Sequence, residues 1–271
     1  ERSPSPAIRC SIAVALGDLA SRFPNLVEPY NARIYARLRD AHPRVRKNVL
    51  MVLAHLILSD MVKVKGLVSE IALCLTDSEA AIRDTTMLFF HELAAKGGNI
   101  IYNIVPDIIS RLSQDQDVSP QAFRDILKHL LEFVGKDKHA DSLLEKICHR
   151  FSTTAEVQTW RCLAFCLSQL NVTEKGIKKL KEAFRLYKHT LSDAPTFEEF
   201  NNVVVKARKF AKPEVKELVE EWYDLLMSTQ VPEEGEEVEG GEGDETAAVD
   251  LEEEINALEI TESDVEEEEE D

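Results

Sequence analysis

Metal-binding or nucleophilic chemistry would need reactive side chains at particular spacings. His91-Glu92 begins like a zinc-protease motif, but Ala95 stands where the second histidine ligand would be required. Cys162 and Cys166 are four residues apart, downstream of Cys148, yet they lie in apolar runs typical of a buried core. The sequence has no glycine-rich phosphate loop and no nucleophile elbow. We therefore expect no catalytic residue, no metal and no cofactor, and an enzyme with a site built across several elements is the weakest alternative.

Arginine and aspartate recur at fixed positions. Arg9, Arg46 and Arg83 are spaced 37 residues apart, and Asp40 and Asp77 precede the last two by six residues. Charged residues at a fixed position of a repeat are typical of contacts between neighbouring units. We expect Asp40, Arg46, Asp77 and Arg83 to form a structural ladder rather than a binding surface.

Other cations do not follow this spacing and are candidates for binding double-stranded DNA. They are Arg33, Arg37, Arg39, Arg44, Lys47, Lys63 and Lys65. A cluster of Lys and Arg can neutralise phosphates without reading base sequence. The alternative is that they merely keep a helix surface solvated.

Two later basic stretches, 175–188 and 206–216, are mixed with glutamate, which favours a solvated surface. Three serines are weak phosphorylation candidates. Ser3 and Ser5 each precede a proline, although Ser5 is equally explained as a helix cap, and Ser263 lies among acidic residues.

The elements that must position these residues are predicted by two apolar series with a 37-residue period. In the first, Ile8, Ile12, Leu16 and Leu19 align with 45, 49, 53 and 56 and then with 82, 86, 90 and 93. In the second, Val27, Tyr30, Ile34 and Leu38 recur at 64–75 and at 101–112. Both spacings describe one face of a helix, so each unit is a helix pair. One pair cannot bury both apolar stripes, so the pairs must stack into an all-α solenoid of the HEAT/armadillo kind.

This pattern divides the chain into three parts. Residues 1–114 are regular repeats, and 115–230 are irregular helix pairs that end the solenoid, with helices near 119–134, 140–151, 155–170, 173–191, 196–210 and 213–229. Residues 231–271 carry 21 acidic and no basic residues, and we expect a disordered tail. All 32 basic residues precede the tail, against 29 acidic ones there, so the net charge of −18 misrepresents the body. Such a tail would compete with DNA phosphates for the same cations, recruit a basic partner such as histones, or simply keep the protein in solution.

The composition excludes some classes of protein. Five cysteines in 271 residues cannot form a disulfide framework, which favours a reducing compartment. No apolar run is long enough for a membrane span, and we expect neither a membrane nor a small-molecule substrate as partner. The first residue is Glu, so we expect a fragment of a longer chain.

Three segments carry a resemblance to a known family. They are YARLRDAHPRVRKNVLMVLAHLILSDMVKVKGL over 35–67, then VSEIALCLTDSE and YNIVPDIISRLS. They resemble the C-terminal HEAT region of the condensin complex subunit 1 family, the HEAT-repeat, non-SMC subunits of condensin I. Weaker similarity continues through DKHADSLLEKICHRF, RCLAFCLSQLNVTEKGIKKL and KFAKPEVKEL.

The resemblance implies a role rather than a catalytic site. It implies a regulatory scaffold that binds the kleisin subunit and the SMC ATPase heads, helps to hold DNA during mitotic chromosome condensation, and is found in the nucleus and on chromosomes with a cytoplasmic pool. The alternative of the same class is a HEAT-repeat adaptor in cytoplasmic trafficking or phosphatase assembly.

Overall fold

Helices make up all the regular structure in the segments that the computed structural model describes, which are 3–62, 67–97, 99–135, 137–210 and 213–230. These segments belong to one unit, Glu1–Val231, and Pro232–Asp271 is a separate unit. The expected acidic tail, Ser263, Lys63 and Lys65 therefore lie outside the described residues.

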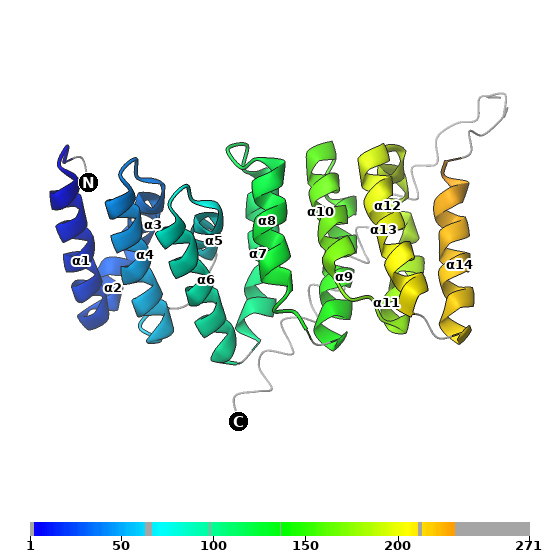
Figure 1. Cartoon of the computed structure of the whole chain (residues 1–271), viewed down its shortest axis with the longest axis horizontal. Coiled ribbons are helices and arrows are strands. Elements are labelled where there is room, and N and C mark those ends of the chain that lie inside the picture. Colours follow the sequence, from blue (N-terminus) through cyan, green and yellow to red (C-terminus); the bar gives the residue numbers. More distant parts are fainter. Residues whose placement is uncertain (1–2, 63–66, 98, 136, 211–212, 231–271) are drawn as a thin grey trace, which may run out of the picture. The chain divides into compact units, whose positions relative to one another are not determined.

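The helices follow one another in pairs along the chain (Figure 1). The first members of the pairs are α1 (Pro6–Arg22), α4 (Pro43–Leu58), α6 (Ala80–Ala95), α8 (Pro120–Leu131), α10 (Val157–Gln169) and α13 (Ala194–Phe210). The second members are α2 (Pro24–Val27) with η1 (Glu28–Tyr30), α3 (Asn31–Tyr35) and η2 (Ala36–Arg39); α5 (Val68–Leu73) with η3 (Cys74–Thr76); α7 (Ile100–Gln114); α9 (Asp137–Ser152); α11 (Glu174–Glu182) with α12 (Phe184–Tyr187) and η4 (Lys188–Ser192); and α14 (Pro213–Ser228).

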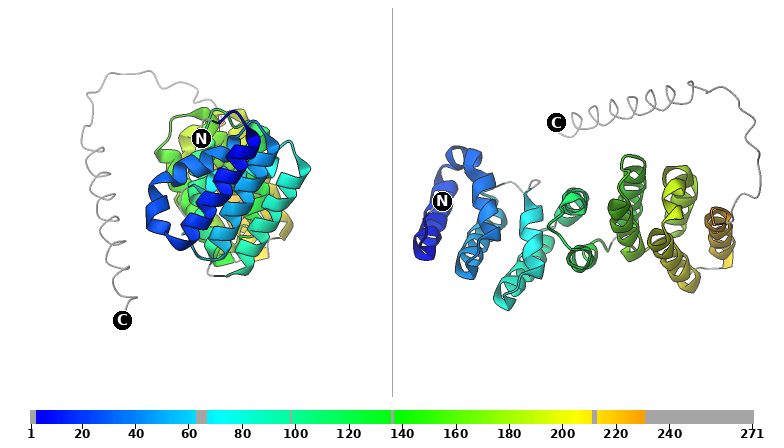
Figure 2. Two further views of the ribbon diagram at one scale, coloured as in Figure 1. Left: turned by 90° about the vertical axis from the view of Figure 1, so that its left-hand side faces the viewer. Right: turned by 90° about the horizontal axis from the view of Figure 1, so that it is seen from above.

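Successive pairs stack on one another. Helix α1 packs on α4, α4 on α6, α8 on α10 and α10 on α13, while α5, α7, α9, α11 and α14 form a second layer in the same order. The view from above in Figure 2 shows the pairs following one another in chain order. The expected all-α solenoid of stacked helix pairs is thus confirmed.

Local sequence signals set several helix ends. Pro43 is the first residue of α4, where its missing N–H costs no hydrogen bond. The hydroxyls of Ser119 and Thr173 accept capping hydrogen bonds from Ala122 N and Gly176 N, each at 3.2 Å. Ser5 is the N-cap residue of α1, but its side chain makes no capping hydrogen bond.

Two predicted helices are broken into shorter pieces. The second helix of the first unit is interrupted around Pro29, which has no N–H for the helical ladder. The predicted helix over 173–191 becomes α11, α12 and η4, with a change of backbone direction at Ala183. That turn places Tyr187 in the core, where its hydroxyl donates to the Leu180 carbonyl at 2.7 Å.

The first apolar series is buried in the second and third units, but most of its members are exposed in the first unit. Its members in α4 and α6, from Val45 to Leu56 and from Ile82 to Leu93, are buried. In α1, however, Ile8, Ile12 and Leu19 are exposed. Ile12 and Leu16 line a small hollow with Ile34 of α3 and Val49 of α4, so these helices cover this side of α1 only in part. Helix α1 buries Ala13, Gly17 and Ala20 instead.

Candidate nucleic-acid interface and inter-unit ion pairs

Arginines of the first helices bind aspartates of the next unit. Arg9 donates from Nε and Nη2 to the carboxylate of Asp40, with both distances 2.9 Å. Arg46 makes the same two bonds to Asp77, at 2.7 and 2.8 Å. In both pairs Nη1 also donates to the backbone carbonyl six residues earlier, Ser3 O at 2.8 Å and Asp40 O at 3.0 Å. Each guanidinium is therefore fixed between its own helix start and the next unit.

The aspartates are equally constrained. The Oδ1 atoms of Asp40 and Asp77 accept hydrogen bonds from the backbone N–H two residues later, at 3.0 and 2.9 Å. Burial alone would raise the pKa of the Asp77 carboxyl, but hydrogen bonds from Arg46 and the Glu79 N–H outweigh it and leave that pKa below its ordinary value. These carboxylates are therefore charged and already occupied by the protein's own donors.

Arg83 differs from the other two arginines at its repeat position. It donates to the carbonyls of Asp77 at 2.6 Å and Ser78 at 3.0 Å, but in the described part of the chain it has no carboxylate partner. The 37-residue period would place the next aspartate of this series at position 114, which is Gln114; the neighbouring Asp115 accepts a hydrogen bond from Arg39 instead.

Sequence reasoning missed a third pair of this type. Arg161 donates from Nε and Nη2 to the carboxylate of Asp193, at 3.0 and 2.7 Å. The hydrogen bonds from Arg161 lower the pKa of Asp193 to about 2. The separation of 32 residues is close to the 31 of the first two pairs. Looking in the sequence for an aspartate 31 or 32 residues after an arginine would have indicated this pair, even though the 37-residue period is lost in this region.

Two of the DNA-binding candidates, Arg33 and Arg37, line one small hollow with Arg9, between α1, α3 and α4. Arg33 is exposed, and its guanidinium lies 5.8 Å from the Tyr30 ring centroid. Arg37 is half-buried, with Nη1 3.8 Å from Asp40 and a buried Nε that has no hydrogen-bond partner within the described segments. Because Arg9 already occupies Asp40, the local positive charge is only partly neutralised.

Arg44 and Lys47 lie three residues apart near the start of α4, on the same side of that helix. Both are exposed, and neither has an ion-pair partner among the described residues. Arg46, between them in sequence, points toward Asp77 and is largely buried.

The structure separates Arg39 from the other candidates. Its guanidinium binds Glu70 at 2.8 and 3.1 Å and Asp115 at 2.7 Å, linking three successive units. The pKa of Arg39 is raised by these hydrogen bonds. Two carboxylates therefore neutralise a side chain that we expected to be available to phosphate.

Four cations of the later basic stretches are paired within the protein, whereas Lys175, Arg185, Lys188, Lys209 and Lys216 have no ion pair among the described residues. Lys178 binds Glu174 at 2.7 Å, and Lys179 binds Glu145. The remaining pairs are Lys181 with Glu221 at 2.7 Å and Arg208 with Glu220 at 2.6 Å.

The cysteines are buried thiols in the part of the chain that is described, apart from half-buried Cys10. Burial raises the pKa of Cys148 to about 12 and that of Cys162 to about 11, so both thiols are protonated at neutral pH. Among the described residues, no group of three or more His, Cys, Asp or Glu side chains is placed to hold a metal ion. None of the helices in the described segments has the length and apolar character needed to span a bilayer.

Comparison with known proteins identifies relatives over most of the chain. Residues 7–168 match the family model of the non-SMC mitotic condensation complex subunit 1. Condensin complex subunit 1 of Xenopus laevis is 50% identical over 83% of this chain and 17% of its own length. The Homo sapiens protein of that name is 49% identical over 84% of this chain and 16% of its own. Condensin complex subunit 1 of Saccharomyces cerevisiae is 39% identical over 67% of this chain and 15% of its own length. The chain thus spans about one sixth of the length of these relatives, and the resemblance seen in the sequence is confirmed.

Proposed function

Because the chain belongs to the family of the non-SMC mitotic condensation complex subunit 1, we propose that it is part of the non-catalytic scaffold of a condensin complex. In this proposal it acts in mitotic chromosome condensation, in the nucleus and on chromosomes with a cytoplasmic pool, and it contacts the kleisin subunit and the SMC ATPase heads. A stacked-pair solenoid suits such a role because each added pair extends the surface available to partners.

The proposal includes direct contact with double-stranded DNA through exposed cations of the first two units. Arg33, Arg37, Arg44 and Lys47 are the described members of this set, and Lys63 and Lys65 complete it from outside the described residues. The observation that carries this part is that Arg33, Arg44 and Lys47 have no ion pair among the described residues. Lys178, Lys179, Lys181 and Arg208 are each bound to a glutamate and serve as a matched set for comparison. Unpaired cations can exchange their counterions for phosphates, which favours binding at low salt. Arg39 is left out because Glu70 and Asp115 already hold it.

The test compares two variants of the whole chain, each of which loses four positive charges. One changes Arg33, Arg37, Arg44 and Lys47 to Gln, and the control changes Lys178, Lys179, Lys181 and Arg208 to Gln. Titration of labelled duplex DNA at several salt concentrations should show weaker binding and a smaller salt slope for the first variant, by roughly 0.9 per lost phosphate contact. The control should bind nearly as the unmodified chain does. Equal losses in both variants, or no loss in the first at low salt, would contradict this DNA surface.

The protein contacts are tested separately. Kleisin and SMC head fragments should be retained by the immobilised chain, and the first Gln variant should retain them as well, because its substitutions remove charges assigned to DNA. Absence of retention with the unmodified chain would contradict the scaffold assignment while leaving the DNA result unaffected.

A further inference from the structure

Three exposed apolar side chains occupy one repeat position on successive first helices. Val14 of α1, Met51 of α4 and Leu88 of α6 are 37 residues apart in sequence and are 46%, 53% and 60% exposed. Single exposed apolar residues are ordinary on protein surfaces. The same position exposed in three successive units is different, because packed helices place these side chains in a row. We name Val14, Met51 and Leu88 the apolar row.

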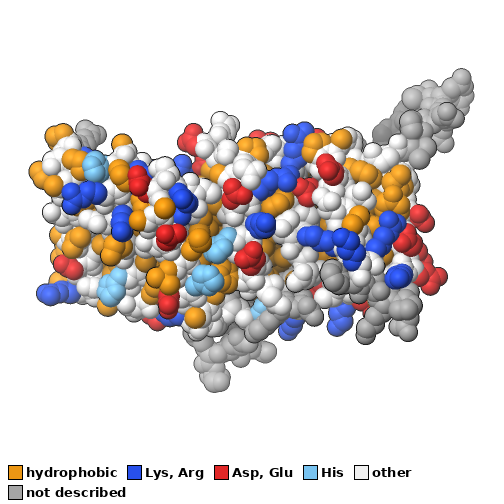
Figure 3. All heavy atoms as spheres, viewed as in Figure 1, with side chains coloured by type: hydrophobic (Ala, Val, Ile, Leu, Met, Phe, Trp, Pro, Cys, Tyr) orange, Lys and Arg blue, Asp and Glu red, His pale blue; other side chains and the backbone are white. Residues whose placement is uncertain are grey.

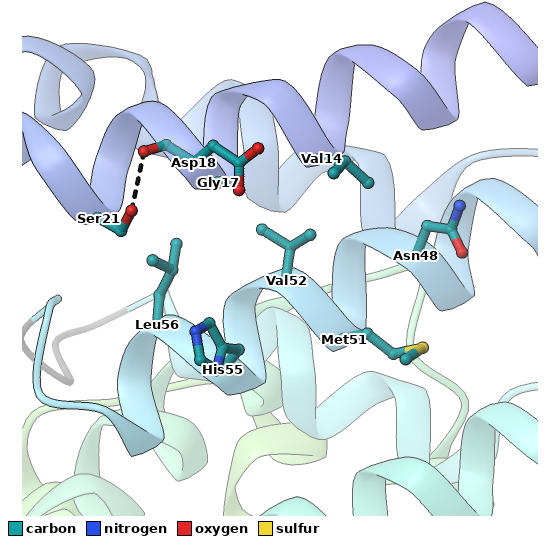
Figure 4. A pocket seen from close by; sticks show the side chains of 9 residues that line it. All are labelled: Val14, Gly17, Asp18, Ser21, Asn48, Met51, Val52, His55 and Leu56. Atoms are coloured by element: carbon teal, nitrogen blue, oxygen red, sulfur yellow. Dashed lines mark hydrogen bonds between the residues drawn. The ribbon is translucent and has the colours of Figure 1, made fainter.

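A hollow of about 280 Å³ lies between the first two members of the row. Val14 and Met51 line it, and Val52 and Leu56 point into it from α4 toward α1 (Figure 4). It lies where α1 approaches α4 closely at Gly17, whose added Cβ would come within 2.5 Å of Val52. The space-filling view from this side shows hydrophobic side chains over α1, α4 and α6 (Figure 3). These side chains are interspersed with charged and polar ones, and the row lies beside a depression able to receive a side chain.

The charges beside the row differ at its two edges. One turn toward the helix C-termini are Asp18 and Glu92, with His55 between them at the equivalent position of α4. Both carboxylates are exposed, and in the described part of the chain neither has an ion pair. One turn toward the N-termini, Lys47 and Asp84 have opposite charges. The C-terminal edge is therefore acidic and would repel phosphates.

We propose that the apolar row binds a segment of a partner protein that combines regularly spaced apolar residues with Lys or Arg on one side. The apolar side chains would contact Val14, Met51 and Leu88, one of them entering the hollow, and the cations would face Asp18 and Glu92. Neighbouring packed helices are roughly 8–10 Å apart. That separation matches apolar residues seven apart on a helix, about 10.5 Å, or three apart in a polyproline II segment, about 9 Å. This proposal uses none of the residues assigned to DNA, although Lys47 of that set borders the row, and it goes beyond the scaffold role.

The experiment selects peptides and then locates them. A random fifteen-residue peptide library is displayed and selected on the whole chain, and enriched peptides are labelled for fluorescence anisotropy. We expect enriched sequences to contain apolar residues at one of these two spacings together with Lys or Arg. Met51→Glu and Leu88→Glu should each weaken binding by about tenfold or more, since they place a charge under an apolar anchor. The matched control is Leu26→Glu on α2, an exposed apolar residue outside the row, which should leave binding unchanged.

A second variant tests the acidic edge. Asp18→Asn combined with Glu92→Gln should weaken the basic peptides by a few-fold at low salt and by less at high salt, because exposed charges are screened. Circular dichroism and thermal melting check that each variant is folded. If Met51→Glu does not fold, Met51→Gln takes its place in the binding measurement. The proposal is overturned if no peptide is enriched, or if binding survives both Met51→Glu and Leu88→Glu. Self-association of the chain that Met51→Glu abolishes would assign the row to a second copy and also overturn it.

Discussion

The regular units before residue 115 and the irregular units after it hold neighbouring helix pairs together by different means. In the first region two interfaces reuse one contact, an arginine bound to the aspartate 31 residues later. In the described part of the second region such a pair occurs once, between Arg161 and Asp193, beside contacts that have no counterpart among the described residues of the first region. Trp222 Nε1 donates to the Tyr187 hydroxyl at 2.9 Å, and the Tyr187 ring stacks on Phe200 with their centroids 4.6 Å apart.

This difference has a consequence for the surface. Where a repeated pair serves an interface, residues at other repeat positions are free to vary, and in the described part of the first region Arg33 and Arg44 have no ion pair. Where the period is lost, some lysines and glutamates of different helices pair across the surface, as Lys181 does with Glu221. Each region nevertheless holds both kinds of cation among its described residues: Arg39 is bound in the first, and Lys175 has no ion pair in the second.

The largest expected effect is loss of the aromatic core of the second region. Trp222→Ala removes a fully buried side chain that also donates to Tyr187, and should lower the free energy of unfolding by about 3–5 kcal/mol. Tyr223→Ala, its partly exposed neighbour in sequence, is the control and should cost much less. In a solenoid each pair contacts only its neighbours, so hydrogen exchange should accelerate mainly over 170–230. Equal acceleration in α4 and α6 would show that the two regions unfold as one.

A smaller loss of stability is expected when the repeated ion pair is broken, and it should exceed the loss caused by breaking an exposed pair. Arg46→Ala leaves the nearly buried Asp77 carboxylate without its two charged donors, and should cost about 1–3 kcal/mol. Arg208→Ala breaks a pair of similar geometry with Glu220, but that pair is exposed, so its loss should cost much less. Urea unfolding of both variants measures the loss in the free energy of unfolding. Equal losses would show that the repeated pair stabilises the fold no more than the exposed pair does.

The smallest effect is a pH dependence specific to Asp193. Its folded pKa of about 2 lies below the ordinary value of about 3.9, so the unfolded chain binds more protons between these values. The stabilisation is complete above about pH 4 and is lost as the pH falls through about 2. Arg161→Gln removes the donor that lowers this pKa, so stability should fall less steeply over that window than in the unmodified chain. Identical pH profiles would mean that the pair does not lower the pKa of Asp193.

The fold was largely predictable because it rests on periodicity. The i, i+4, i+8, i+11 spacing at Val45 and Ile82 predicted helices that are present and buried. The same spacing predicted a buried face for α1, and there Ile8 and Ile12 are exposed. Periodicity says which residues share a face, whereas burial also requires a neighbour to cover that face.

The candidate interface was predictable only in part, because residue type and spacing do not reveal pairing across units. Arg39 and Arg44 were equivalent candidates in the sequence. The structure places Glu70 and Asp115 around Arg39 and leaves Arg44 exposed. Those two partners are 31 and 76 residues from Arg39, beyond the reach of any local pattern.

By itself, the sequence determined the helix-pair repeat, the separation of an acidic segment from a nearly neutral body, and the family. Each depends on composition or on spacing along one chain, which hydrophobic burial and helix geometry translate directly into structure. Only the tertiary structure decided which cations are neutralised, that Arg161 binds Asp193, and that Val14, Met51 and Leu88 form an exposed row. These depend on how one helix pair is placed against the next, since a salt bridge or a surface row is made by atoms that meet only after the pairs have stacked.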